Sequence, residues 1–239
     1  MVFNDTTNAS GIIQTIEYLC DFSPATISGD ATKLKQFTAS INQAQHNVRH
    51  LIFLTTGNWE YDGGNHIDLP SATTSLDAGV KRYLMPPDAL TMQRLEIKDI
   101  NGNLSRLKPI SKELIKGSLD EFMKEPGTPT YYRLVDNTIE LFPAPNYTQA
   151  DSLKMYFDRA DTDFLTSDTI KTPGFASLYH KIIPIKASIE WFKIKQPQSQ
   201  TLAILLQDEL KLQKEIVEFY SRRFKDYKPR ISRQVENYK

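Results

Sequence analysis

The spacing of apolar residues changes twice along this chain, and that change limits the folds the chain can adopt. Near both ends, apolar residues recur every three or four positions, which places them on one face of an α-helix. Between about residues 58 and 160, short stretches alternate apolar with polar residues and are separated by Gly, Pro, Asn and Asp, as in strands joined by turns. The pattern predicts helices at both ends with a β-region between them.

Two helices are predicted before residue 58. The first lies within the first 25 residues, with Asn8 or Ser10 as its N-cap. Its apolar stripe is Ile12, Ile13, Ile16, Tyr18 and Leu19. The second spans about 30–56, with Asp30 as N-cap and Gly57 in the left-handed conformation that ends many helices. Its apolar face is Leu34, Phe37, Ile41, Ala44, Val48 and Leu51.

The middle region predicts a small antiparallel sheet or sandwich. Its strand-like stretches are 80–84, 95–100, 104–107, 131–135, 138–142 and 153–157. The fourth and fifth stretches flank Asp136-Asn137, which favours a hairpin with a two-residue turn. One helical patch, about 111–124 with Ser111 as its cap, interrupts the strands.

Two further helices are predicted after the β-region. One spans about 174–195 and has Pro184 inside it, where the missing N–H should cause a kink. The other spans about 199–226, and its apolar side is Leu202, Leu206, Leu210, Val217, Tyr220 and Phe224. The predicted fold class is therefore α+β, a helical bundle of long helices with an inserted small antiparallel β-domain. The predicted divisions are N-terminal helices 1–57, a β-rich domain 58–173, C-terminal helices 174–226 and a basic tail 227–239.

Composition excludes several classes of protein. The 239 residues carry 29 basic and 29 acidic side chains, which argues against a general nucleic-acid coat because phosphate binding needs excess Lys and Arg. The single cysteine, Cys20, excludes an internal disulfide framework. No apolar run approaches the ~18 residues of a membrane helix, and no secretory signal pattern occurs. We expect a protein that is soluble when made in the cytoplasm, or a virion component.

Sequence motifs for catalysis and phosphate binding are missing. Neither a phosphate-binding glycine pattern nor a G-x-S-x-G turn occurs. Asp161, Asp163 and Asp168 form the one cluster in which paired carboxylates could perform acid–base chemistry. Solvation and capping of a loop are the simpler interpretation of that cluster. We therefore predict that the protein is not an enzyme and has neither catalytic residues nor a cofactor.

Two groups of residues invite a metal-site interpretation. His46 and His50 have the four-residue spacing of a zinc site on a helix, but Asn47 stands where a metalloprotease has Glu. Both histidines also avoid the apolar face of their helix, which favours a solvated position. Around Asp62, His66 and Asp68 the EF-hand pattern is not met, so a turn is favoured. No metal site is predicted.

The C-terminal segment, residues 222–239, has seven basic and two acidic residues. Apolar and aromatic residues lie between the charges, and Arg and Tyr often anchor interfaces. The alternatives are a solvated, frayed end and a partner-binding tail. The candidate interface residues are Arg222, Arg223, Lys225, Tyr227, Lys228, Arg230, Ile231, Arg233 and Tyr238.

One stretch of the β-region resembles a known family. A Gly-x-Pro-x-Tyr segment precedes the predicted hairpin, an Ile-x-Leu-x-Pro-x-Pro segment follows its turn, and a Leu-x-Met-Tyr segment comes next. This pattern resembles the head-to-tail adaptor (connector) proteins of short-tailed bacteriophages, including the crAss-like group. The residues that carry the resemblance are Gly127, Pro129, Tyr131, Ile139, Leu141, Pro143, Pro145 and Tyr156.

The resemblance implies a structural virion protein of the tail or neck. Such proteins form an oligomeric ring, usually twelvefold, that docks on the portal protein and other tail proteins. The ring continues the channel through which viral DNA passes without sequence-specific binding, and C-terminal segments often reach the portal. Two alternatives remain: a more distal ring of the tail, or a glycan- or peptide-binding module that uses Trp59, Tyr61 and Tyr147. No membrane partner is expected.

Overall fold

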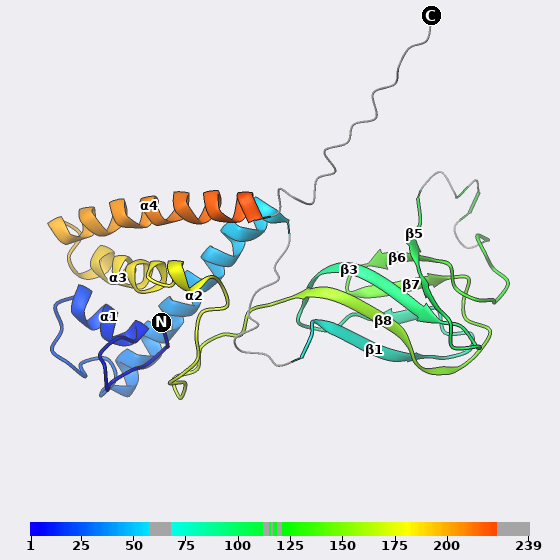
Figure 1. The fold of residues 1–239 in the computed structure, drawn as a ribbon, viewed down its shortest axis with the longest axis horizontal. Helices are drawn as coiled ribbons and strands as arrows, with labels where there is room; N and C mark the ends of the chain where they lie inside the picture. Colours follow the sequence, from blue (N-terminus) through cyan, green and yellow to red (C-terminus); the bar gives the residue numbers. More distant parts are fainter. Residues whose placement is uncertain (58–67, 112–114, 116, 119–120, 224–239) are drawn as a thin grey trace, which may run out of the picture. The chain divides into compact units, whose positions relative to one another are not determined.

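The computed structural model describes residues 1–57, 68–111, 115, 117–118, 121–222 and the backbone of Arg223 (Figure 1). The chain divides into two compact units. Residues Met1–Ile67 and Asp161–Lys239 form a helical unit, and Asp68–Ala160 form a β unit that is inserted in the sequence between them. Within the described residues, no helix has the length and apolar character needed to cross a membrane.

Helix α1 (Ile12–Leu19) buries Ile12, Ile13 and Ile16, as the apolar stripe predicts. Its N-cap is Gly11, which offers no side chain for capping, so the prediction of Asn8 or Ser10 was wrong. Both residues bind Asp5 instead: the Ser10 hydroxyl donates to the Asp5 carboxylate at 2.7 Å, and the Asn8 backbone N–H donates at 3.0 Å. Tyr18 was also wrongly placed in the stripe, because it faces solvent.

Helix α2 (Ala31–Thr56) begins and ends as the sequence predicts. The Asp30 carboxylate accepts hydrogen bonds from the N–H groups of Thr32 at 2.9 Å and Lys33 at 3.2 Å. Gly57 has φ 76°, a left-handed conformation that glycine adopts without strain, and its N–H bonds to the Phe53 carbonyl. Four residues of the predicted face are buried: Phe37, Ile41, Ala44 and Val48.

Helix α3 (Ile182–Lys195) follows a short 3₁₀ turn, η2 (Ser177–Tyr179). The kink predicted at Pro184 was wrong, because the helix begins only at Ile182. Pro184 therefore lies in the first turn, where its missing N–H has no helical partner to lose.

Helix α4 (Gln200–Arg223) packs against α2 and α3. Leu202 and Tyr220 are buried as predicted, together with Leu205 and Ile216, which the predicted face omitted. The other described members of that face, Leu206, Leu210 and Val217, are exposed. The prediction therefore merged two neighbouring stripes of α4, one buried and one at the surface. Phe224 lies outside the described residues.

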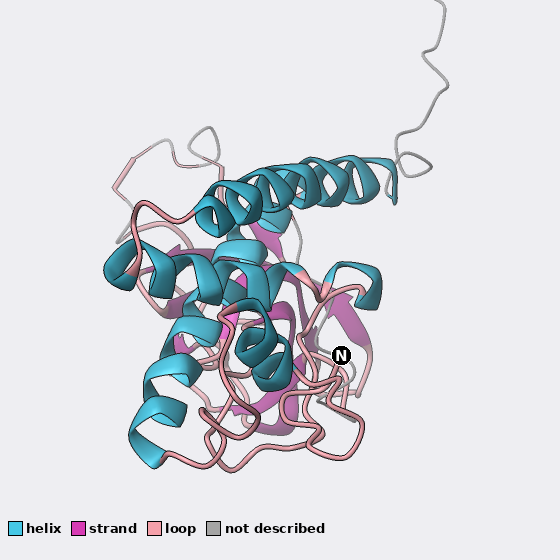
Figure 2. Ribbon diagram, turned by 90° about the vertical axis from the view of Figure 1, so that its left-hand side faces the viewer, coloured by secondary structure: helices cyan, strands magenta, loops and turns pink. Residues whose placement is uncertain are grey.

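The helical unit, whose helices are drawn in cyan in Figure 2, has one continuous apolar core. It joins the four helices to the N-terminal segment and to the chain that returns from the β unit. Phe3 stacks on Phe164 with ring centroids 5.0 Å apart, and Phe22 meets Trp191 edge-on at 5.1 Å. The first contact joins the N-terminal segment to the returning chain, and the second joins the segment between α1 and α2 to α3.

The β unit contains two four-stranded sheets, with strand orders β1-β8-β3-β4 and β2-β7-β6-β5. All pairs of strands are antiparallel except the short parallel pair β5–β6. The strands are β1 (Ser71–Leu76), β2 (Arg82–Leu84), β3 (Ala89–Lys98), β4 (Leu104–Arg106), β5 (Lys108–Pro109), β6 (Tyr131–Val135), β7 (Thr138–Phe142) and β8 (Gln149–Arg159).

Alternation along the strands builds the core between the two sheets. Leu95 and Ile97 of β3 point inward with Leu153 and Met155 of β8, and Ile139 of β7 meets them from the second sheet. This second core shares no residue with the core of the helical unit. Each unit therefore has an apolar interior of its own.

The predicted bundle of long helices with a small inserted β-domain was wrong. The fold is α+β, with helices of 8 to 26 residues and two full sheets of four strands. Two strands gave no apolar alternation: β1 is rich in Ser and Thr, and β5 has two residues. Strands β3 and β8 extend past their apolar residues, because polar residues at their ends also pair through backbone hydrogen bonds between strands. The predicted helix 111–124 lies partly outside the described residues, and Glu121–Met123 form a turn.

Candidate functional site

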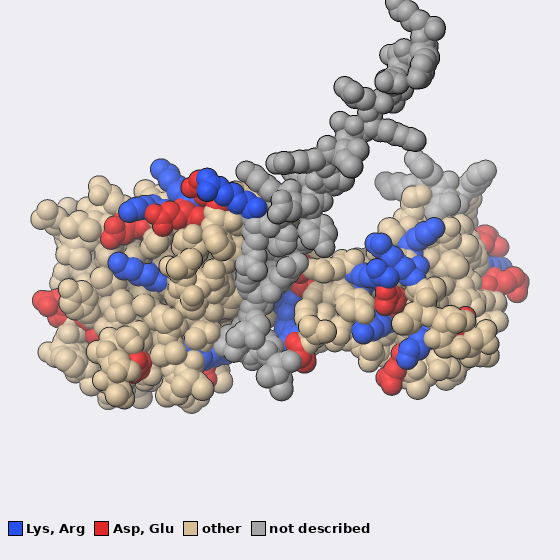
Figure 3. Space-filling view, viewed as in Figure 1, with Lys and Arg blue, Asp and Glu red and all other residues tan. Residues whose placement is uncertain are grey.

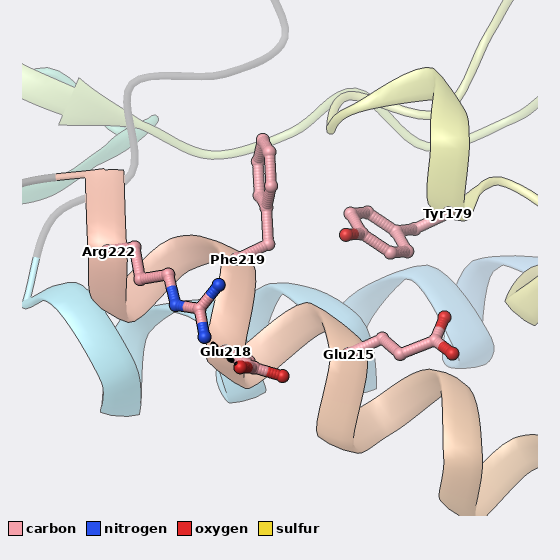
Figure 4. A pocket seen from close by; sticks show the side chains of 5 residues that line it. All are labelled: Tyr179, Glu215, Glu218, Phe219 and Arg222. Atoms are coloured by element: carbon pink, nitrogen blue, oxygen red, sulfur yellow. Dashed lines mark hydrogen bonds and ion pairs between the residues drawn. The ribbon is translucent and has the colours of Figure 1, made fainter.

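A surface depression lies at the C-terminal end of α4, next to the start of the predicted tail (Figure 4). Its volume is about 490 Å³, and it is lined by Tyr179, Glu215, Glu218, Phe219 and Arg222. The rings of Tyr179 and Phe219 meet with centroids 5.4 Å apart. Arg222 forms an ion pair with Glu218 one helical turn away. Aromatic faces beside carboxylates can hold a cationic side chain of a partner.

Tyr220 positions this end of α4. Its ring is fully buried, and its hydroxyl accepts a hydrogen bond from the Ala176 N–H at 3.0 Å. The bond connects the last turns of α4 to the segment before η2, so both walls of the depression are held together.

The predicted tail interface is described only at its beginning. Arg222 lies on α4, exposed and paired with Glu218, and Arg223 ends the helix. The remaining candidate interface residues lie outside the described residues: Lys225, Tyr227, Lys228, Arg230, Ile231, Arg233 and Tyr238.

The residues that carry the family resemblance surround the β6–β7 hairpin. Gly127 and Pro145 form a bridge between the segments that enter and leave it, and the Gly127 N–H donates to the Ala144 carbonyl at 2.8 Å. A Cβ atom at Gly127 would lie 3.2 Å from the Pro143 ring, so little room exists for a side chain. Pro129 and Pro143 stand just outside the strands, where a missing N–H breaks no ladder bond.

The other residues of that pattern occupy the sheets. Ile139 and Leu141 are buried in the core between the sheets, and Tyr131 pairs with Phe142 across the hairpin. Tyr156 lies on β8 beneath the Lys154 ammonium, 4.8 Å from the ring centroid. The pattern is therefore a set of packing and turn positions in the β unit.

Asp161, the first residue of the predicted acidic cluster, is an interior anchor. Its side chain is fully buried, forms an ion pair with Arg49 and accepts a hydrogen bond from the Gln45 amide at 2.6 Å. The second residue of the cluster, Asp163, lies two positions later, and its carboxylate is 2.6 Å from Nε2 of His46. Asp168 accepts from the Leu165 N–H at 2.9 Å. Asp161 and Asp163 thus hold the returning chain on α2, and Asp168 closes a turn within that chain.

Asn42 completes this contact between α2 and the returning segment 161–164. Its side-chain amide donates to the Phe164 carbonyl at 3.0 Å and accepts from the Phe164 N–H at 2.8 Å. Asn42, Gln45, His46 and Arg49 have the spacing of one helix face. We name these four residues the polar clamp. A helix face of polar residues therefore binds four consecutive residues of an extended chain.

The metal-site interpretations gain no geometric support. His50 is exposed, while His46 is engaged by Asp163. Asp62 and His66 lie outside the described residues, and Asp68 is paired with Arg159 at 3.3 Å. Among the residues that the structure describes, no group of three or more His, Cys, Asp or Glu side chains could hold a metal ion.

The β unit carries a cluster of cations on one sheet. Glu140 of β7 is flanked by Arg82 of β2 and Arg133 of β6 in one cross-strand row, and Lys81 approaches the same carboxylate at 4.0 Å. Burial raises the pKa of Glu140, but the hydrogen bond from Arg133 and the three nearby cations outweigh this effect and place its pKa below the usual value. Lys and Arg side chains also gather on the visible face of the β unit (Figure 3).

An exposed aromatic platform for a glycan is not supported at Tyr147. Its ring is buried, and its hydroxyl donates to the Lys98 carbonyl at 2.9 Å. The side chain therefore attaches the loop before β8 to the core. Trp59 and Tyr61 lie outside the described residues.

The fold is a helical unit with a β unit inserted in its sequence, and the sites described above consist of side-chain contacts and one surface depression. Comparison with known families gives the class: a family model described as SU10 adaptor protein matches residues 7–193. The chain therefore belongs to the SU10 adaptor protein family and is a bacteriophage adaptor protein, consistent with a structural tail or connector role. A search of curated proteins found no match.

The family match covers α1, α2, the whole β unit and all but the last two residues of α3, and it ends before α4. It supports the predicted resemblance to phage adaptors and does not establish the crAss-like group. The sequence signal for the family came from the hairpin residues. No sequence pattern predicted the depression at the end of α4 or the segment that the polar clamp binds, because both features join segments far apart in the chain.

Proposed function

We propose that this adaptor protein forms an oligomeric ring that connects the capsid portal to the tail of a short-tailed phage, of which the crAss-like group is one example. The observation that carries the proposal is the family match over residues 7–193. The ring continues the DNA channel and contacts passing DNA without reading its sequence. Its partners are further copies of the chain, the portal protein and other tail proteins, and its place is the neck or tail of the virion.

The protein acts in this proposal as a scaffold without catalysis. The carboxylates that could have served as acid and base are engaged: Asp161 with Arg49 and Gln45, and Asp163 with His46. Separate apolar cores in the two units suit a protein that offers several surfaces to neighbours.

The C-terminal segment from Arg222 to Lys239 is the proposed contact with the portal. Excess Lys and Arg beside Tyr residues favour a partner surface that bears carboxylates. Removal of residues 226–239 leaves all described parts of the helices in place. The shortened protein should therefore keep its thermal unfolding profile and lose portal binding.

Portal binding by the full chain and by the shortened chain is measured by co-sedimentation with purified portal from the same phage. A matched control replaces Lys211, an exposed cation on α4, with Gln. We expect the control to bind like the full chain and the shortened chain to remain in the supernatant. Equal binding by all three proteins would refute the role of the tail. Binding to another tail protein instead of the portal would favour a more distal ring.

A further inference from the structure

Helix α4 carries a second apolar stripe beside its buried one. Its members are Ala203, Leu206, Leu210, Gln213 and Val217, at alternating steps of three and four residues. This is the spacing of a seam at which one helix packs along another. All but Gln213 are exposed, and 57% of Leu210 is accessible. We name these five residues the α4 stripe.

A groove of about 350 Å³ lies between α2 and α3. Its apolar lining is Phe37, Ala187, Trp191 and Ile194, and Glu190 and Lys195 provide charges. No residue of α4 lines it, so the α4 stripe of the same copy does not fill it. Ile194 is 76% exposed there, so its side chain offers apolar surface to a neighbouring molecule. We name this feature the α2–α3 groove.

Charges beside the two surfaces run in opposite order. Lys214 and then Glu218 follow one another along the outer edge of the α4 stripe. Along the groove, Glu190 is followed by Lys195, and Lys193 lies between them on α3. When α4 lies along α3 in the same direction, each cation therefore meets a carboxylate. The present partners of these groups, Arg222 for Glu218 and Lys193 for Glu190, form exposed ion pairs that are easily exchanged.

We propose that the α4 stripe of one copy packs into the α2–α3 groove of the next copy. A closed ring needs two different, complementary surfaces on each subunit, and this chain carries one apolar ridge and one apolar groove. The inference deepens the proposed function, since it names the contact that holds neighbouring copies together. It also assigns a role to α4, which lies beyond the family match.

Cross-linking between two differently tagged full-length copies tests this contact. In the register that sets Lys214 against Glu190, Val217 of the α4 stripe lies beside Ile194. One copy therefore carries Val217→Cys and the other carries Ile194→Cys, and a short bis-maleimide joins thiols that lie close together. Burial raises the pKa of the native Cys20 thiol to about 11, so the wild-type chain supplies the unreactive background. The control copy carries Lys211→Cys, an exposed position that lies about 120° around α4 from Val217.

The sample contains portal, and ring formation is scored in parallel by electron microscopy. We expect rings, with the Val217/Ile194 pair cross-linked at least tenfold more than the Lys211/Ile194 pair. Rings without the selective cross-link would overturn this contact and leave the proposed function intact. A selective cross-link without rings would support the contact and count against the ring. Absence of both would overturn both.

A charge exchange provides a second readout that altered folding would not mimic. Lys214→Glu and Glu190→Lys should each weaken association between copies several-fold, because each places like charges together. The two substitutions combined in one chain should restore it. Additive weakening in the combined variant would contradict the predicted pairing.

Discussion

Loss of the Arg49 guanidinium should destabilise the helical unit because it leaves a buried charge without its partner. In Arg49→Met, the Asp161 carboxylate keeps the Gln45 amide but loses its cation. Removing one member of a buried pair costs about 3–5 kcal/mol, and Arg49 is partly exposed, so we expect about 3 kcal/mol. For a chain of this size, that loss lowers the melting temperature by about 6–12 °C.

A double variant tests the effect of the unpaired buried charge more directly. Adding Asp161→Asn removes the unpaired charge, so Arg49→Met/Asp161→Asn should be more stable than Arg49→Met by about 1 kcal/mol or more. Calorimetry or thermal circular dichroism at 222 nm measures both. The control is Lys33→Met, which removes an exposed ion pair with Asp30 at 3.9 Å and should change stability by less than about 0.5 kcal/mol. A double variant that is less stable than Arg49→Met would refute the buried-charge explanation.

Three further predictions concern single contacts. Burial lowers the pKa of His180 below its usual 6.5, so the contribution of the neutral ring to stability is complete above pH 6.5 and declines as the pH falls below that value. Urea unfolding at pH 7.5 and pH 5.5 measures how much stability each protein loses between the two values. His180→Phe should lose less than wild type, and equal losses would refute this. Asp30→Ala should cost about 1 kcal/mol by removing the cap of α2, measured by urea denaturation, with an unchanged midpoint as the contrary result. Tyr220→Phe should cost about 1–2 kcal/mol, because the Ala176 N–H loses its acceptor, and protection of that amide from hydrogen exchange should fall.

Sequence patterns within a few residues correctly predicted the ends of α2 and the β6–β7 hairpin, because these boundaries depend on neighbouring residues. Asp30 and Gly57 define α2 because capping is chemistry within a few residues. The hairpin of β6 and β7 follows from strand composition around a two-residue turn. Asn8 and Ser10 failed as caps because Asp5, a nearby competing acceptor, binds both.

Long-range contacts explain the remaining differences. The buried side of α4 depends on where α2 and α3 lie, so periodicity alone could not separate Leu205 and Ile216 from the exposed Leu206 and Leu210. Strand β1 forms because its backbone pairs with β8, far along the chain, and its Ser- and Thr-rich residues give no apolar pattern.

The candidate site was predictable only in part. Asp161 and Asp163 were singled out as a cluster, but their partners on α2 lie more than a hundred residues earlier. A usable signal did exist, since Asn42, Gln45, His46 and Arg49 share one face of a helix whose other face is apolar. That polar face could have indicated a binding surface, although not the segment that it binds.

Electron microscopy of the purified protein mixed with portal from the same phage tests the central claim most directly. The portal must be present because the proposed contact is with the portal. We expect a second ring stacked coaxially on the portal, and this ring should be absent when the protein is omitted. A portal that stays bare at saturating protein concentration would contradict the account.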